Sequence, residues 1–380
     1  MQKAASGNAK ALYITTNNQE NTVCAVEIGQ DGLITGKGAA LKTGGAGANG
    51  VDGTTNGTAA PDALFSQSAL TIAGENIFVV NAGSNSLSMM AIDPKDPLSL
   101  KMVGQPVSLP GEFPNTVAAS RKNKLVCVGM TGKKAGVSCC SFDAKKGLGQ
   151  MDGLREIDLG QTTPPVGPTN TMSQVFFSSD ETQLYATVKG DPAQKKNGFF
   201  SVYTVQKGQK EASVSQQDVR SSPAGTAVLF GSAVIPGSSD VFVTDASFGA
   251  ALLGLDAKSN AAAVKGKASV DGQKATCWAT ISPATNTAFV TDVGKNRLVE
   301  VSFTDKFQIV GVVDLSSANQ DPGLIDLKAG GDFIYALSPG NGSTECGISV
   351  VDAKSKKLVQ HAGLEGVGAG KNSMGMALLQ

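Results

Sequence analysis

Histidine is almost absent from this sequence. His361 is the only one in 380 residues, and it follows the last outer strand, where we expect a solvated loop residue. Imidazole is the side chain that most often moves protons near neutral pH. A single copy excludes a Ser-His-Asp or Cys-His nucleophile and makes histidine-based acid–base chemistry improbable. It also excludes a transition-metal site built on several histidines. Any chemistry in this protein is therefore expected to use other groups.

The sequence also lacks a charge surplus and long apolar runs. Its 32 basic side chains balance 32 acidic ones, and charged residues make up only 17%. Nucleic acid and anionic membranes are not expected as partners, because they need a basic surface. No apolar run approaches the ~20 residues of a membrane span. No apolar core of a secretory leader follows Met1-Gln2-Lys3, although the sequons at Asn56 and Asn341 favour secretion or passage through the secretory pathway.

The sequence also lacks apolar residues that recur at the 3.6-residue spacing of an α-helix. Its 46 glycines indicate many turns instead. Seven short apolar runs recur, and each is followed by a turn and a second alternating strand. Most follow a strand of small and apolar residues, which suits the innermost strand of a blade. The runs begin at Leu12, Ile77, Leu125, Leu184, Val241, Ala288 and Ile334. This repeat predicts an all-β, seven-bladed β-propeller that forms one domain over residues 1–380.

The two ends of the sequence complement each other. The run at Leu12 has no inner strand before it, and residues 371–380 resemble an inner strand with nothing after it. We expect the C-terminal strand to complete the first blade and close the ring, which removes exposed edges. The alternative is an open solenoid with a frayed end.

A long Gly/Thr-rich insertion, residues 42–60, separates blades one and two and is suited to form a rim or lid. Its Gly45-Ala-Gly-Ala-Asn-Gly motif lacks the flanking strand and helix of a dinucleotide site, so we expect a loop.

The six cysteines leave their pairing open. Cys139 and Cys140 are adjacent, so in a strand they point to opposite faces and cannot easily chelate a metal together. We expect no metal and no cofactor, with a calcium site made of Asp, Glu and Asn oxygens as the alternative. The cysteines are Cys24, Cys127, Cys139, Cys140, Cys277 and Cys346.

Three motifs carry a family resemblance. Gly111-Glu-Phe-Pro-Asn-Thr-Val-Ala-Ala-Ser, Phe176-Phe-Ser-Ser-Asp-Glu-Thr-Gln-Leu-Tyr and Val80-Asn-Ala-Gly-Ser-Asn-Ser-Leu-Ser are similar to the repeat of the 6-phosphogluconolactonase and carboxymuconate-cyclase-like propellers. The resemblance spans the chain and concerns blade pattern, so it implies the fold more than the activity. The chain most resembles fungal members, many of them secreted or tied to secondary metabolism, which include propellers implicated in hetero-Diels–Alder cyclisation. Where that family commonly has a histidine, this chain has Asn115.

Propellers bind ligands where loops enter the innermost strands, so the candidate site residues come from those loops. Asn115, Lys274 and Gln273 are candidate hydrogen-bond donors to a carbonyl, and Glu112 or Asp321 is suited to promote loss of water. Phe113, Met172, Trp278 and Met374 are expected as apolar walls. Trp278 can equally pack between blades, and Glu112 and the lysines can be solvated. The catalytic candidates are Glu112, Asn115, Lys274 and Asp321; the substrate-binding candidates are Asp62, Phe113, Asn170, Met172, Gln174, Gln273, Trp278, Lys371, Asn372 and Met374.

Three functions fit these residues. The first is cyclisation of a hydrophobic small molecule, which needs no histidine because positioning alone can supply about 7–11 kcal/mol. The second is a lactonase or lactone-forming cycloisomerase in which a carboxylate or lysine moves the proton. The third is a non-catalytic secreted binding or adhesion propeller. A deep apolar cavity lined by Phe113 and Trp278 favours the first, and a channel plugged by side chains argues against both enzymes. The sequence does not set the substrate or the oligomeric state.

Overall fold

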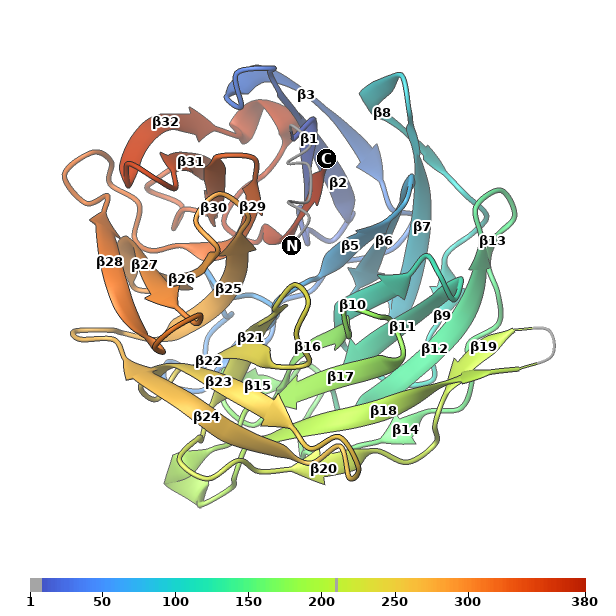
Figure 1. Ribbon diagram of the computed structural model, residues 1–380. Coiled ribbons are helices and arrows are strands. Elements are labelled where there is room, and N and C mark those ends of the chain that lie inside the picture. Colours follow the sequence, from blue (N-terminus) through green and yellow to red (C-terminus); the bar gives the residue numbers. More distant parts are fainter. Residues whose placement is uncertain (1–8, 209–210) are drawn as a thin grey trace.

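The computed structural model describes residues 9–208 and 211–380, and Met1-Gln2-Lys3 lies outside them. The described chain forms seven antiparallel sheets arranged as a ring around a central axis (Figure 1). Its only helices are two short 3-10 turns, η1 (Pro192–Gln194) and η2 (Glu365–Val367). No helix in the described ranges is long and apolar enough to cross a membrane. The prediction of an all-β, seven-bladed propeller is confirmed.

The blades are built alike, and their strands run in order from the axis outwards. Blade 1 contains β33 (Met374–Leu379), β1 (Ala11–Thr15), β2 (Thr22–Ile28) and β3 (Ile34–Lys42). Blade 2 contains β5 (Leu70–Ala73), β6 (Asn76–Asn81), β7 (Ser86–Asp93) and β8 (Asp96–Met102), with β9 (Val107–Ser108) also on β7. Blade 3 contains β10 (Pro114–Ser120), β11 (Leu125–Met130), β12 (Gly136–Asp143) and β13 (Gly147–Leu148), with β14 (Arg155–Glu156) also on β12. Blade 4 contains β16 (Met172–Phe177), β17 (Gln183–Val188), β18 (Phe199–Lys207) and β19 (Ala212–Val214), with β20 (Val219–Ser221) also on β18.

The remaining three blades follow the same order. Blade 5 contains β21 (Leu229–Val234), β22 (Val241–Asp245), β23 (Gly249–Leu255) and β24 (Ala262–Ser269). Blade 6 contains β25 (Thr276–Ser282), β26 (Thr287–Asp292), β27 (Lys295–Ser302) and β28 (Gln308–Asp314). Blade 7 contains β29 (Ile325–Gly330), β30 (Phe333–Ser338), β31 (Gly347–Asp352) and β32 (Lys357–Gly363).

Burial explains which residues form each strand. The second strands β6, β11 and β22 are buried along their whole length, because neighbouring blades cover both faces. The outer strand β32 instead alternates exposed and partly buried positions, as a strand with one solvated face does. Inner strands need small residues. At Gly231 in β21, an added Cβ would collide with the Gln67 side chain and the main chain of Cys277.

The last strand closes the ring as expected. β33 pairs antiparallel with β1, so that Ala11 lies opposite Leu379, and Lys10 N–H donates to Leu379 O at 2.8 Å. Blade 1 is therefore made from both ends of the described chain, which removes the free inner edge that β1 would otherwise present.

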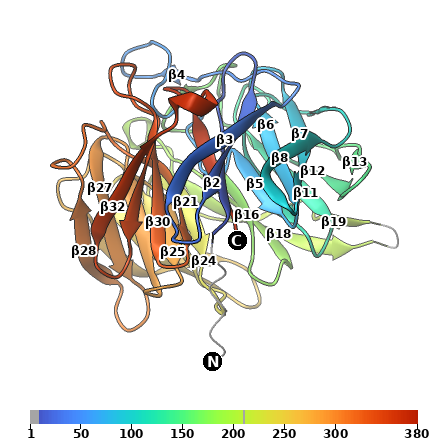
Figure 2. The same ribbon diagram turned by 90° about the horizontal axis from the view of Figure 1, so that it is seen from above.

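The insertion of residues 42–60 lies on the face that carries β4 (Val51–Asp52) in Figure 2, which we call the upper face. β4 pairs in parallel with β15 (Val166–Gly167), which precedes blade 4. No helix follows the Gly45-Ala-Gly-Ala-Asn-Gly motif, which confirms a loop. The insertion thus spans the upper face from blade 1 to the entrance of blade 4. The opposite, lower face carries the C-terminus (Figure 2).

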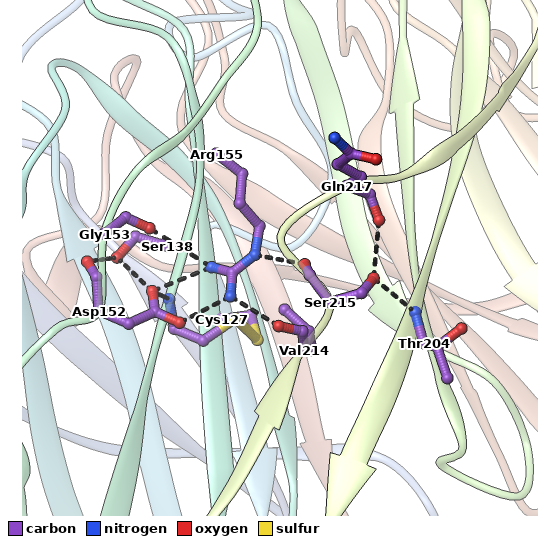
Figure 3. A network of polar contacts seen from close by, with 10 residues as sticks. Cys127, Ser138, Asp152, Gly153, Arg155, Thr204, Val214, Ser215 and Gln217 are labelled. Carbon is purple, nitrogen blue, oxygen red and sulfur yellow. Dashed lines mark hydrogen bonds and ion pairs between the residues drawn. A yellow bond between two sulfur atoms is a disulfide. The ribbon is translucent and has the colours of Figure 1, made fainter.

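A buried arginine joins blades 3 and 4 (Figure 3). The Arg155 guanidinium contacts both carboxylate oxygens of Asp152, at 3.0 Å and 2.8 Å. It also donates to the main-chain oxygens of Ser215 at 2.7 Å and Val214 at 2.8 Å, next to β19. Charge-assisted, two-pronged bonds of this kind are strong and directional. Arg155 therefore fixes the outer part of blade 4 on blade 3.

One disulfide lies beside this network. Cys127 and Cys139 are register partners on β11 and β12 and form the bond, and Cys139 N–H donates to Asp152 Oδ1 at 2.7 Å. This bond accounts for two of the six cysteines, whose pairing the sequence left open. The other cysteines are buried free thiols: Cys24, Cys140, Cys277 and Cys346.

Candidate functional site

The centre of the ring is occupied by the chain itself. Residues 63–67, which we call the axial segment, follow the insertion and are at most 2% exposed. They bond to the inner strands of four blades, which hold the segment across the axis. The bonds are Asn115 Nδ2 to Leu64 O (3.1 Å), Gln67 N to Ser173 O (2.9 Å), Gln67 Nε2 to Ser232 O (3.3 Å) and Trp278 Nε1 to Ser66 O (3.0 Å).

The apolar residues expected to line an axial pocket are packed instead. Phe113, Met172, Trp278 and Met374 are each at most 1% exposed. Trp278 lies edge-on to Phe230, with ring centres 4.9 Å apart. Phe113 and Trp278 therefore do not line the deep apolar cavity that would have favoured cyclisation, because both side chains are packed. This filled axis argues against an enzyme site inside the channel, for cyclisation and for lactone hydrolysis alike, and leaves only the mouth of the axis for a site.

A carboxylate and an ammonium group lie at the upper end of the axial segment. Asp62 directly precedes the segment and is partly exposed, whereas its Oδ1 is buried and has no hydrogen-bond partner among the described residues. Lys189 follows β17 and is 1% exposed. Its Nζ donates to Phe65 O at 2.6 Å and Ser173 Oγ at 3.1 Å, and it lies 4.2 Å from the centre of the Phe230 ring.

Burial dominates the electrostatics of this pair. It raises the pKa of Asp62 to about 7, although the charge of Lys189 and the N–H groups of Phe65 and Ser66 act in the opposite direction. Burial likewise lowers the pKa of Lys189 to about 8, against the effect of Asp62. Asp62 is partly accessible, and the burial of its Oδ1 is the physical cause of the raised pKa. A carboxyl group that titrates near neutral pH suits proton transfer.

Asn115 differs from its predicted role as a donor. Both of its N–H bonds are used within the protein, because Nδ2 donates to Leu64 O at 3.1 Å and Met172 O at 2.7 Å. Its Oδ1 is buried and has no partner in the described ranges. An amide has only two donor hydrogens. Asn115 therefore holds the axial segment and offers an acceptor instead of a donor.

The other predicted amides are likewise engaged within the protein, Gln174 between the inner strands β16 and β21 and the other three in the entry loops. Each makes at least one bond of 3.1 Å or less to another residue. The bonds are Asn170 Nδ2 to Leu159 O (2.5 Å), Ser232 N to Gln174 Oε1 (2.6 Å), Gln273 Nε2 to Ala246 O (3.1 Å) and Asn49 Nδ2 to Asn372 Oδ1 (2.9 Å). These side chains shape the mouth of the axis.

Three charged candidates lie on the rim. Glu112 accepts a bond of 2.5 Å from Thr163 Oγ1, and the Lys274 and Lys371 residues are exposed. In residues 9–208 and 211–380, no hydrogen bond or ion pair joins any of them to Asp62 or Lys189. The structure therefore does not gather the four predicted catalytic residues into one cluster.

Asp321 is paired with the single histidine. His361 lies in β32, where a solvated loop was expected, and its Nε2 is 3.1 Å from Asp321 Oδ2. The bond to Asp321 raises the pKa of His361. Because β32 is an outer strand, Asp321 turns its carboxylate away from the axis. Its role as an acid in the chemistry stays a prediction, and the structure shows its carboxylate engaged by His361.

Sequence reasoning missed Lys189 and Cys277. Lys189 directly follows the apolar run of β17, where a lysine usually belongs to a solvated turn. Cys277 is buried beside Asp62 and Lys189, and burial raises the pKa of its thiol well above the usual value. It is therefore a protonated thiol and not an activated nucleophile. Only the fold places these residues together.

Metal ligands do not gather in the part of the chain that the structure describes. No three His, Cys, Asp or Glu side chains there lie close enough to hold a metal ion. The calcium alternative thus finds no such ligand set in that part. The expectation that the protein works without a cofactor stays a prediction.

The two cavities described next both lie away from Asp62. One of about 620 Å³ opens on the lower face between blades 2 and 3, and no predicted site residue lines it. A smaller one of about 230 Å³ lies between β5, β10 and β16, with Ser68 on its wall. It lies against the inner strands just beyond the end of the axial segment.

Comparison with known proteins supports the fold. No protein-family model matches the chain, and no curated protein matches it by sequence. Among solved structures, the periplasmic gluconolactonase of Pseudomonas aeruginosa has a TM-score of 0.67 and 14% identity, over 97% of this chain and 99% of that one. A protein of unknown function from Desulfotomaculum acetoxidans has a TM-score of 0.65 and 11% identity, over 98% and 99%. A protein assigned as a 6-phosphogluconolactonase from Bacteroides fragilis has a TM-score of 0.59 and 11% identity, over 100% of both.

These identities are low, so the likeness establishes architecture and leaves activity open. The neighbours include lactonase-type propellers, as the sequence motifs indicated. The fungal and Diels–Alder features of the resemblance find no counterpart among these three neighbours. The chain is a seven-bladed propeller whose structural neighbours include lactonase-like proteins.

Proposed function

We propose that this protein hydrolyses a small lactone at the upper end of the ring axis. Asp62 acts as the general base and Lys189 stabilises the oxyanion. The observation that carries the proposal is a buried Lys189 ammonium, bonded to Phe65 O, whose charge acts on the Asp62 carboxyl group, which has a buried Oδ1 without a partner among the described residues. The names of two structural neighbours support the reaction class.

The chemistry needs no histidine. Asp62 takes a proton from a water molecule while the water oxygen attacks the lactone carbonyl carbon. The negative charge that develops on the carbonyl oxygen is stabilised by the positive field of the buried Lys189 ammonium, which acts from beneath the substrate and not through a direct hydrogen bond. When the ring C–O bond breaks, protonated Asp62 returns its proton to the leaving alkoxide. The product is a hydroxy acid.

The site favours a small, polar substrate. Asp62 is the accessible member of the pair, while the axial segment blocks the channel below it. A sugar-type lactone suits this polar mouth better than a large apolar metabolite. Cyclisation of a hydrophobic molecule, the first function predicted from the sequence, is less well supported, because Phe113 and Trp278 are packed and do not line a pocket.

We also propose that the protein is exported. The Cys127–Cys139 disulfide supports an oxidising compartment, and the sequons at Asn56 and Asn341 lie on exposed turns. One structural neighbour is named as periplasmic.

The test is hydrolysis of D-glucono-δ-lactone and δ-valerolactone by the full chain in a pH-stat, corrected for spontaneous hydrolysis. Asp62→Asn and Lys189→Met are each expected to lower kcat/KM by about 100-fold or more. Asp305→Asn and Lys306→Met, which change exposed residues of blade 6, serve as matched controls and keep full activity. Circular dichroism confirms that each variant is folded.

The pH profile gives a second readout. Activity rises as Asp62 ionises near pH 7 and falls as Lys189 loses its proton near pH 8, which gives a narrow bell. In Lys189→Met the acid limb moves to higher pH, because the charge that lowers the pKa of Asp62 is gone. A wild-type protein that hydrolyses neither lactone, or an active Asp62→Asn variant, overturns the proposal and favours a non-catalytic binding propeller.

A further inference from the structure

We propose that the 620 Å³ cavity on the lower face, which we call the lower cavity, binds a small organic anion. It lies between blades 2 and 3, and residues of their lower turns line it together with Lys10, Leu379 and Gln380 at the ends of blade 1. Its volume falls within the range of small-molecule sites, about 300–1,000 Å³. The proposal does not rest on lactone hydrolysis, because none of the Asp62 site residues lines this cavity.

Cations without partners surround the lower cavity. Arg121, Lys124 and Lys145 line it, and none of their charged groups makes an ion pair or hydrogen bond within the described residues. Lys10 lines it too, and its Nζ reaches only Gln380 O, at 3.4 Å. Four cationic side chains around one concave space form an attractive site for a negative charge.

The carboxylates on the same wall are largely occupied. Asp93 Oδ1 accepts the N–H of Lys95 at 2.8 Å. Asp143 Oδ1 accepts the N–H groups of Lys145 and Lys146, both at 2.9 Å. Asp93 and Asp143 each accept N–H groups of the turn in which they lie. Glu75 is the third acidic side chain that lines the cavity. Hydrogen bonds from main-chain N–H groups leave the charge of a carboxylate in place, so four cationic side chains face three acidic ones around the cavity, which is an excess of one positive charge for a ligand.

The walls also specify the shape of the ligand. Gly74 has φ +66°, and an added Cβ would lie 3.3 Å from Arg121 Cδ and 3.4 Å from its Nε. The arginine therefore lies flat against the chain, where its planar group can receive two oxygens of a carboxylate or phosphate. Ile92 and Phe142 supply apolar surface beside it. This combination fits an anionic group attached to a compact ring.

The test measures binding of phenyl phosphate, benzoate and neutral benzyl alcohol to the full chain by isothermal titration calorimetry. The two anions are expected to bind and benzyl alcohol is not. The comparison of phosphate with carboxylate identifies the preferred head group. Arg121→Gln is expected to weaken binding at least 10-fold and Lys145→Gln about threefold. Binding should also weaken as salt rises from 50 to 300 mM, because the charges are exposed.

Lys258→Gln is the matched control. Lys258 lies in the corresponding turn of blade 5, and its N–H bonds to Asp256 Oδ1 as that of Lys145 bonds to Asp143. Its replacement should leave binding unchanged. Absence of saturable binding by both anions overturns the proposal, and so does equal weakening by Arg121→Gln and Lys258→Gln. Lactone hydrolysis that persists in Arg121→Gln shows that the two sites are separate.

Discussion

At the upper end of the axis Lys189 is buried and bonded to Phe65 and Ser173, whereas around the lower cavity Arg121 is exposed and unpaired. The difference lies in solvation. Burial moves the pKa values of Lys189 and Asp62 toward neutrality, which prepares them for proton transfer. Exposed cations act by long-range attraction, which salt weakens. The upper site is thus suited to chemistry and the lower one to binding.

The largest expected contrast concerns stability. Trp278→Ala removes a fully buried side chain and its bond to Ser66 O, so we expect a loss of about 3–5 kcal/mol in the free energy of unfolding. Arg121→Ala at the lower cavity is expected to change it by no more than about 0.5 kcal/mol. Urea unfolding followed by far-UV circular dichroism, which does not depend on the indole, measures the free energy of unfolding of both variants. Similar losses in the two variants would show that the axis is not the rigid part of the ring.

The pH dependence of the free energy of unfolding tests whether the carboxyl group of Asp62 is buried. Because the pKa of Asp62 is raised, its contribution to stability is present below its unfolded pKa and is lost as the pH rises through about 7. Asp62→Asn has no charge to bury, so it should gain stability relative to the wild type between pH 4 and pH 7, by up to about 1.4 kcal/mol per pH unit. Urea unfolding at five pH values measures the slope. Asp305→Asn should show no such trend, and an equally flat Asp62→Asn would contradict the buried charge.

The His361–Asp321 pair is partly buried, between the buried Asp62 carboxyl group and the exposed Arg121 side chain. The pKa of His361 is raised by Asp321, so its contribution to stability is present below its unfolded pKa and is lost as the pH rises through the folded value. For a partly exposed pair we expect less than about 1 kcal/mol. Comparing His361→Gln with the wild type at pH 5.5 and pH 8.5 measures this difference. A larger loss at the higher pH would reverse the sign and exclude the pairing.

Much of the fold was predictable because it follows local patterns. The alternation around Ile77 or Leu184 depends on neighbouring residues only, and the strands appear at those positions. Ring closure followed from the missing strand before Leu12 and the spare strand at residues 371–380, which the structure places at Met374–Leu379. The Cys127–Cys139 bond was not predictable, because it depends on the register of the β11–β12 hairpin.

The candidate site was predictable only in part. The entry loops do lie on the upper face, and Asp62 was among the candidates. Lys189 was missed because its burial depends on the axial segment, which arrives from more than 100 residues earlier in the chain. Phe113 and Trp278 are packed and buried, and no local pattern shows that residues 63–67 bond to Trp278 across the axis.

The axial segment also sets a constraint on the order of folding. The bond between Ser66 and Trp278 joins residues 212 positions apart, and contacts so distant in sequence form slowly, because a long loop must close first. Until blades 3 to 6 are in place, Leu64 and Phe65 have no interior to enter and stay available to other molecules. By the same reasoning the ring closes later still, because the pairing of Ala11 with Leu379 spans a longer stretch of chain, so refolding should pass through an open ring.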